Sequence, residues 1–181
     1  QAGYGDVEPT DGAGARTMRA AITRGYGTPD RLRIDDVGLP ELGDDDVLLR
    51  VMAAAVCRGD TFLQSGKPYL VRLSGYGLLR PRAAIPGQSL SGEVVAIGSG
   101  VREFRKGDQV FGEIPAGAFA EYAAAKAELL APKPTRLSHG EVAALALSGI
   151  TALQGLRDVG HLQAGECVLI NGASGRVGAR A

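Results

Sequence analysis

Short apolar runs separated by turn residues make up the chain from Thr17 to Pro134. Runs this short, several of them alternating and bounded by Gly, Pro or Asp, are typical of β-strands. The segment "CRGDTFLQSG" (57–66) between two of them indicates a turn with at most one helical turn. Their shortness and spacing predict a small β-barrel or curled sheet. The strands are predicted within residues 18–22, 31–37, 47–56, 91–98, 104–112, 117–125 and 128–134.

The pattern changes after Pro134, where the apolar positions take on a helical spacing. Ser138 with Glu141 three residues later is a capping-box pattern, so a helix is predicted over 138–147. A second helix is predicted over 149–160, because a glycine closes that segment.

A short buried strand is predicted next, over 164–170. The chain therefore divides into three parts, with the boundary between the last two near the start of the first helix. These parts are a disordered Gly- and Asp-rich tail (1–16), a β-rich domain (17–140) and the beginning of a second domain (141–181).

Composition narrows the class of protein but not its activity. Of the 181 residues, 45% are hydrophobic and 22% are charged, as in an ordinary globular domain. Lys plus Arg and Asp plus Glu both number 20, and this zero net charge argues against nucleic acid or a membrane surface as a partner. No apolar run approaches the ~20 residues of a membrane span and no signal peptide precedes the first strand, so a cytoplasmic protein is predicted. Cys57 and Cys167 are too few for a disulfide framework and are interpreted as reduced thiols.

A glycine turn near the end of the sequence is the main local motif. Gly172, Gly175 and Gly178 follow the apolar run "CVLI". Strand, glycine turn and helix in this order bind pyrophosphate in dinucleotide sites, because glycine lets the backbone approach the ligand and a helix N-terminus attracts negative charge. The Gly-Lys-Ser/Thr of a P-loop does not follow. From these residues alone, a dinucleotide turn and an ordinary glycine-rich loop both stay open.

Four longer stretches carry a resemblance to a known family: "SGEVVAIGSGVREFRKGDQVFG", "GAFAEYAAA", "LALSGITALQGL" and "AGECVLINGASGRVG". Together they resemble medium-chain dehydrogenases/reductases, and more closely the zinc-independent NAD(P)H quinone oxidoreductases. The resemblance implies a mainly β fold, with a GroES-like β-barrel catalytic domain (17–140) followed by the first βα unit of a truncated Rossmann domain (141–181). We expect a fragment, inactive alone, of a homodimeric oxidoreductase that transfers a hydride to a small-molecule quinone or conjugated carbonyl.

Zinc alcohol dehydrogenases of the same family carry Cys-x-x-Asp, then Gly-His-Glu, then another Cys near the domain junction. Here Cys57 in "CRGD" matches the first position, but Gln88 and Ser89 in "GQS" replace the His and the Glu. The junction segment "ALALSG" holds no Cys, and catalytic zinc needs three protein ligands. No metal site is therefore predicted. Cys57 is expected to line a pocket as an ordinary thiol, while His139 and His161 are expected to be solvated.

A reductase without a metal needs a proton donor for the oxyanion that hydride transfer creates. Tyr69, after "SGKP", matches a position where some family members place a tyrosine near the substrate. Tyr69 is therefore the predicted catalytic residue, with Tyr76 as second choice. The alternative for both is a loop anchor whose hydroxyl lies in water.

The resemblance also implies cofactor contacts outside the glycines. Arg58 matches a phosphate-contacting position, and Thr151 in "GITAL" matches a position beside the nicotinamide. The alternatives are a surface arginine and a hydroxyl turned to its own helix. NADPH is the expected cofactor and NADH stays open, because the residue that reads the ribose would follow the turn by ~20 residues. The predicted cofactor-binding residues are Cys57, Arg58, Thr151, Gly172, Ala173, Ser174, Gly175, Arg176, Val177 and Gly178.

Two other functions stay open. One is an alcohol dehydrogenase-like enzyme that keeps Cys57 in an altered metal site. The other is a non-catalytic binding protein on the same scaffold. Stoichiometric zinc would indicate the first, and cofactor binding without reduction of any quinone or enone would indicate the second.

Overall fold

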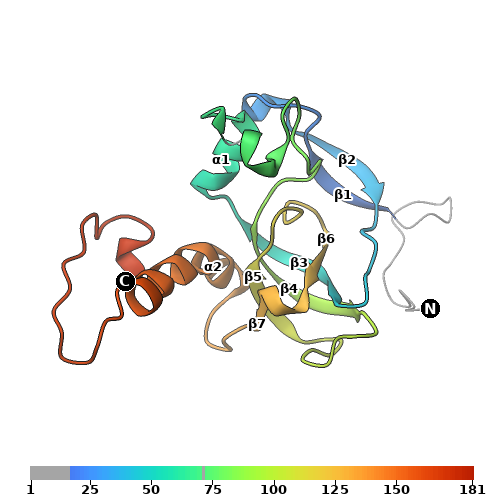
Figure 1. Ribbon diagram of the computed structural model, residues 1–181. Coiled ribbons are helices and arrows are strands. Elements are labelled where there is room, and N and C mark those ends of the chain that lie inside the picture. Colours follow the sequence, from blue (N-terminus) through green and yellow to red (C-terminus); the bar gives the residue numbers. More distant parts are fainter. Residues whose placement is uncertain (1–16, 71) are drawn as a thin grey trace.

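Antiparallel strands form the body of the molecule in the computed structural model, which describes residues 17–70 and 72–181 (Figure 1). Two of them pair as a ribbon, β1-β2, and five form a sheet in the order β6-β3-β4-β5-β7. The mainly β fold predicted from the sequence is confirmed. The strands are β1 (Thr17–Ile22), β2 (Arg33–Gly38), β3 (Asp46–Ala55), β4 (Ser89–Ile97), β5 (Gln109–Glu113), β6 (Tyr122–Lys126) and β7 (Leu130–Pro132).

Two α-helices and several short helical turns complete the described residues. Helix α1 follows β3, and α2 extends from the sheet toward the C-terminal segment (Figure 1). Neither helix combines the length and the apolar character that crossing a bilayer requires. The helices are α1 (Arg58–Ser65) and α2 (His139–Leu153), and the turns are η1 (Pro29–Arg31), η2 (Arg72–Tyr76), η3 (Ala127–Leu129), η4 (Gln154–Val159) and η5 (Gly178–Arg180).

The ribbon and the sheet are joined at one edge. Ala20 forms a bridge with Ala120, and the Ala21 N–H donates to the Phe119 carbonyl at 2.8 Å. Strand β3 also has two register shifts against β4, and such bulges increase the local twist. The extra twist lets the sheet curl around its own side chains, which confirms the predicted curled sheet.

The core lies inside this curl and is built from alternate positions of the strands. Its fully buried members come mainly from β3, β4 and β5, and α2 covers the same three strands. Alternation places every second side chain on the inner face, so a period-two apolar pattern encodes the core directly. The largest of these side chains are Val47, Leu49, Leu90, Val94 and Val110.

Truncating one of these side chains should leave a cavity that the barrel cannot close. We expect Leu90→Ala to lower the free energy of unfolding by about 2–5 kcal/mol, measured by urea denaturation. Leu79 is exposed, so Leu79→Ala serves as the control. It should change the free energy of unfolding by less than about 0.5 kcal/mol. Equal losses in the two variants would contradict this location of the core.

Helix α1 is longer than the single helical turn that the sequence suggested. Cys57 is its N-cap residue, and the Cys57 N–H donates to the Asp60 carboxylate at 2.7 Å. Gly66 ends the helix in the left-handed conformation, at φ 61°. A cap at each end gives eight residues a regular helix in a segment with few apolar positions.

Helix α2 begins as predicted and continues past the predicted break. The Ser138 hydroxyl accepts from the Glu141 N–H at 3.3 Å, and the Glu141 carboxylate accepts from the Ser138 N–H at 2.8 Å. The prediction of a second, separate helix over 149–160 is wrong, because η4 continues α2 without a gap. A glycine inside a helix weakens it by only about 1 kcal/mol, which packing against the sheet offsets.

His139, expected to be solvated, instead connects α2 to the sheet. Its Nδ1 lies 2.8 Å from the Ser91 hydroxyl oxygen, and that hydroxyl donates to the Val110 carbonyl. The histidine therefore donates to Ser91. Burial lowers the pKa of His139 below its ordinary value, and the positive charge of Lys133 lowers it further.

This lowered pKa makes stability depend on pH. The unfolded chain binds a proton at His139 more readily than the folded chain does, so stability is full above the ordinary histidine pKa and is lost as the pH falls below it. We expect wild type to lose more stability than His139→Gln between about pH 8 and about pH 5, followed by urea unfolding. Parallel pH curves for the two proteins would count against this role of His139.

The predicted strand over 164–170 is not formed. This segment has no regular secondary structure, Cys167 is exposed, and Leu169 is 95% exposed. Figure 1 shows it as a loop that leaves α2 and returns to it. A strand needs a neighbour to pair its backbone groups, and none of the described strands lies along this one.

Candidate active site

The start of α1 brings together two segments that the sequence singled out. A Cβ on Gly59 would lie 3.1 Å from the Gln88 side-chain oxygen and 3.4 Å from the Cys57 sulfur. "CRGD" and "GQS" therefore meet in space. Cys57 is buried. Burial raises the pKa of its thiol, and the neighbouring Asp60 carboxylate raises it further, so the thiol stays protonated and unreactive.

Glu113 is an acidic neighbour that sequence reasoning missed. It lies opposite Ser89 in the β4–β5 register. Burial raises the pKa of Glu113, and the negative charge of Asp60 raises it further. Asp60 itself is only 5% exposed. Nothing in the local pattern of β5 marks this glutamate, because only the register of two strands brings it near α1.

No group of three or more His, Cys, Asp or Glu side chains that could hold a metal ion occurs in residues 17–70 and 72–181. Beside Cys57, Gln88 offers a neutral amide, and one Asp60 oxygen is already bonded to the Cys57 N–H. This donor set does not fit the three thiolate, imidazole or carboxylate ligands of a catalytic zinc.

The glycine turn is compact, and two of its glycines are required by its geometry. Gly172 has φ +78°, a conformation that side chains disfavour. A Cβ on Gly178 would lie 2.5 Å from the Gly172 carbonyl oxygen. The Gly175 N–H donates to the same carbonyl at 2.9 Å, and η5 begins at Gly178. Ala173, Ser174 and Val177 lie on the exposed surface of this turn.

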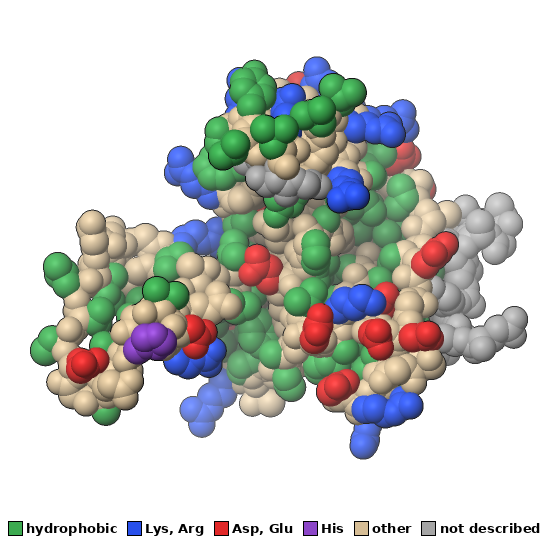
Figure 2. All heavy atoms as spheres, in the orientation of Figure 1, with side chains coloured by type: hydrophobic (Ala, Val, Ile, Leu, Met, Phe, Trp, Pro, Cys, Tyr) green, Lys and Arg blue, Asp and Glu red, His purple; other side chains and the backbone are tan. Residues whose placement is uncertain are grey.

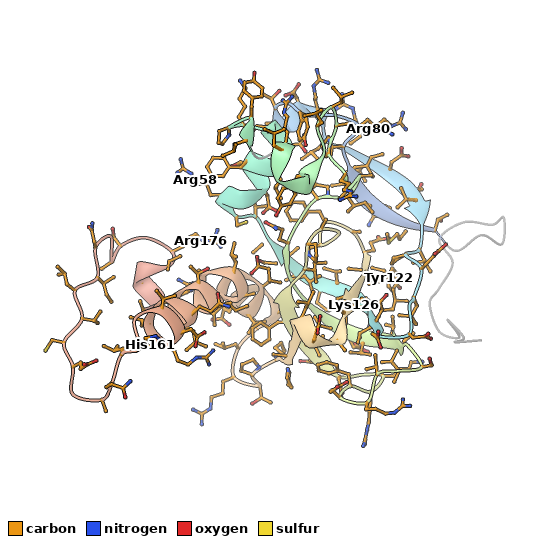
Figure 3. The ribbon with its side chains drawn as sticks, viewed as in Figure 1. Arg58, Arg80, Tyr122, Lys126, His161 and Arg176 are labelled. Atoms are coloured by element: carbon orange, nitrogen blue, oxygen red, sulfur yellow. The ribbon has the colours of Figure 1, made fainter. Side chains whose placement is uncertain are left out.

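Arg176 ties the turn to the rest of the molecule. Its guanidinium donates to the Val56 carbonyl at 2.9 Å and to the Ala144 carbonyl at 3.4 Å. Figure 3 shows Arg176 between α2 and the β-sheet body, on the same side of the molecule as Arg58. Three segments far apart in sequence therefore meet here: the end of β3, the middle of α2 and the glycine turn.

The two remaining predicted cofactor contacts are exposed. The Arg58 guanidinium carbon lies 5.6 Å from the centre of the Phe62 ring. The Thr151 hydroxyl donates to the Leu147 carbonyl of its own helix at 2.8 Å. Both side chains thus adopt the arrangement expected of surface residues. Their predicted roles toward a cofactor stay predictions.

An apolar pocket of about 700 Å³ lies beside α1. We call it the α1 pocket. Val56, at one side of it, is the residue whose carbonyl binds Arg176, so the pocket and the glycine turn share a border. Leu32, Phe62, Pro86 and Phe119 supply much of its apolar lining.

Arg72 holds the two loops that flank this pocket. Its guanidinium carbon lies 4.3 Å from the centre of the Tyr26 ring and 4.9 Å from that of the Tyr69 ring. Its Nε donates to the Gly66 carbonyl at 3.0 Å. Gly27 and Pro68, the neighbours of the two tyrosines, line the α1 pocket. The stack of Tyr26, Arg72 and Tyr69 thus connects the two pocket walls on which Gly27 and Pro68 lie.

Tyr69 and Tyr76 both lie in this loop region but face different surroundings. Tyr69 is 66% exposed, and Tyr76 lines a smaller cavity with Leu63 and Gln64. Figure 2 shows hydrophobic side chains gathered with Lys and Arg over this part of the molecule. The sequence has no acidic residue between Asp60 and Glu93, and the Arg72 guanidinium lies over the Tyr69 ring.

Replacing Arg72 should weaken the connection between the loop of Tyr26 and the loop of Tyr69. We expect Arg72→Leu to lower the free energy of unfolding by about 1–2 kcal/mol, because two cation–π contacts and one hydrogen bond are lost. Arg80 is exposed at the same end of the molecule, so Arg80→Leu is the matched control and should cost less than about 0.5 kcal/mol. Thermal and urea unfolding measure both variants. If Arg72→Leu lowers the free energy of unfolding by no more than Arg80→Leu does, the stack does not stabilise these loops.

Comparison with known proteins agrees with this fold. Residues 43–135 match the alcohol dehydrogenase GroES-like domain, and the chain belongs to that family. It is similar to 2-methylene-furan-3-one reductase of Solanum lycopersicum, with 34% identity over 89% of this chain and 42% of the relative. It is also similar to the chloroplastic NADPH-dependent alkenal/one oxidoreductase of Arabidopsis thaliana, with 31% identity over 90% of this chain and 43% of the relative.

Among solved structures, the quinone oxidoreductase from Coxiella burnetii matches with a TM-score of 0.76 and 29% identity, over 90% of this chain and 51% of that one. These relatives confirm the resemblance to medium-chain quinone and enone reductases and the GroES-like barrel. The chain spans about half the length of the curated relatives it matches.

Proposed function

We propose that this barrel is the substrate-binding half of a zinc-independent NADPH-dependent oxidoreductase that reduces quinones or conjugated carbonyls. The observation that carries the proposal is the Arg176 contact, which holds the glycine turn against Val56 at the border of the apolar α1 pocket. A nucleotide on the turn and an apolar acceptor in the pocket would then be neighbours. The names of the quinone and alkenal/one oxidoreductases similar to this chain support the same reaction class.

The glycine turn fits the proposed cofactor. Gly178 approaches the Gly172 carbonyl more closely than any side chain would allow, and the exposed turn residues leave its outer face open. Because these glycines carry no side chain, a pyrophosphate would be able to approach the backbone amides of the turn closely. NADPH, when bound, supplies the hydride. NADH is the alternative, and Gly172 to Gly178, Thr151 and Arg58 are the proposed contacts.

The chain's own residues would exclude water, hold the acceptor and supply a proton. The apolar lining of the α1 pocket excludes water from an uncharged acceptor and strengthens the electrostatic interactions inside. The Cys57 thiol stays protonated, so it does not compete as a nucleophile for a conjugated carbonyl. Tyr69 is the proposed proton donor to the reduced oxygen, and its exposure lets the phenol regain a proton from water.

A bulky residue at the turn should abolish this function. We expect Gly178→Val to weaken NADPH binding by the complete protein on the order of 100-fold, because the new side chain displaces the Gly172 carbonyl. Dissociation constants from calorimetry and the rate of NADPH oxidation with menadione measure the effect.

Gly140, in α2, is the matched control, because a Cβ there meets nothing within 4 Å. Gly140→Ala should bind and oxidise NADPH as wild type does. Unchanged NADPH affinity in Gly178→Val would refute the assignment of the turn. Wild-type protein that binds NADPH but reduces neither quinones nor enones would instead indicate a binding protein on this scaffold.

A further inference from the structure

A cluster of exposed apolar side chains lies at the end of the molecule that carries α1. The cluster follows α1 along the chain, and Figure 1 shows this loop away from the C-terminal segment. Its side chains are between 62% and 88% exposed. Exposed apolar side chains scattered singly are ordinary, but a contiguous group marks an interaction site. We call this cluster the leucine tip, and its members are Tyr69, Leu70, Leu73, Leu78 and Leu79.

The charged residues of the same stretch of sequence all have one sign. Residues 61–92 contain Lys67, Arg72, Arg80 and Arg82 but no Asp or Glu. Figure 2 shows Lys and Arg side chains beside the hydrophobic ones at this end, and Figure 3 places Arg80 there. The zero net charge of the whole chain, which argued against a membrane surface, therefore hides a local positive excess.

A pocket lined by three arginines lies next to this loop. It has a volume of about 400 Å³, and its charged lining residues are Arg24, Arg31, Arg33 and Asp35. The Tyr26 hydroxyl donates to the Gly77 carbonyl, which connects the turn that carries this pocket to the loop of the leucine tip. Guanidinium groups bind phosphate oxygens well, and three of them outweigh one carboxylate. The arginine pocket therefore fits a phosphate group beside the tip.

We propose that this end of the molecule binds the surface of a bilayer that contains anionic phospholipid. The leucines of the tip enter the boundary between headgroups and acyl chains, while the arginine pocket and Lys67 bind lipid phosphates. Tyr69 suits the same boundary, because its ring is apolar and its hydroxyl can stay in water.

The charge pattern favours a bilayer over a second copy of this chain. Two leucine tips in contact would bring the cations of one copy against those of the other, and like charges oppose association. An anionic bilayer instead presents phosphate groups and apolar chains side by side. That combination matches both the arginine pocket and the leucine tip.

Membrane binding goes beyond the proposed function and does not depend on it, but the two would work together. Lys67 and Pro68 line the α1 pocket, and Tyr69 of the leucine tip follows them directly in the chain. Quinones and enones with large apolar groups concentrate in bilayers, because transfer of apolar surface out of water is favourable. Binding there would place the α1 pocket where such acceptors accumulate.

Vesicle sedimentation with the complete protein tests the proposal. The probes are vesicles of phosphatidylcholine alone and vesicles in which about 30% of the lipid is phosphatidylserine. We expect the anionic vesicles to bind wild type at least about tenfold more tightly, with an affinity that falls as salt is added.

Leu79→Ser should weaken binding to the anionic vesicles by about tenfold, because an apolar side chain no longer enters the bilayer. Ile34→Ser is the matched control. Ile34 is 72% exposed, but it lines a different groove together with Met52. This control should bind as wild type does.

The charge is tested in the same way. Arg24→Glu and Arg80→Glu should each weaken binding to the anionic vesicles by about tenfold. Arg105→Glu makes the same change of charge in the loop between β4 and β5, and it should alter binding by less than about twofold.

Equal binding of wild type to the two kinds of vesicle, binding to neither, or equal effects of a variant and its control would each overturn the inference. A dimer that Leu79→Ser dissociates would also overturn it, because a second copy would then cover the leucine tip. Oxidation of NADPH with menadione in the absence of vesicles tests the proposed function separately, so the two failures are distinguishable.

Discussion

The hydrogen bond from the Cys57 N–H to Asp60 is the interaction on which the site depends. It starts α1 directly after β3, and it holds in the interior a carboxylate that would otherwise prefer water. Because β3 pairs with β4 and β6 on its two sides, the first turn of α1 follows an interior strand of the sheet. The α1 pocket, the protonated Cys57 thiol and the raised pKa of Glu113 all follow from this placement.

The second half of the site is attached in a different way. The glycine turn packs little apolar surface against the barrel, and the loop before it is exposed. What holds it is Arg176, whose guanidinium bridges the carbonyls of Val56 and Ala144. A planar group with several donors suits this task, because it can bond two carbonyls from different elements at once. The site thus combines a pocket built on the sheet with a glycine turn that is held by the hydrogen bonds of Arg176.

The sequence predicted the strands well and the second domain poorly, for one physical reason. An alternating strand such as β6 carries its own signal, because every second residue faces the core. The segment 164–170 has the same apolar character, but a strand also needs a partner for its backbone groups, and the described residues provide none. Helix α2 differed from the prediction because packing against the sheet carried it through Gly149, where local propensity favoured a break.

Local chemistry alone determined the capping box at Ser138, the glycines required at 172 and 178, the poor ligand set for zinc at Cys57 and the family to which the chain belongs. Only the tertiary structure decided that His139 bonds Ser91, that Glu113 lies near Asp60, and that Arg72 stacks between Tyr26 and Tyr69. A sequence pattern records what each residue requires of its immediate neighbours. These contacts instead join side chains from separate elements, so they exist only once register, curl and packing have brought those elements together.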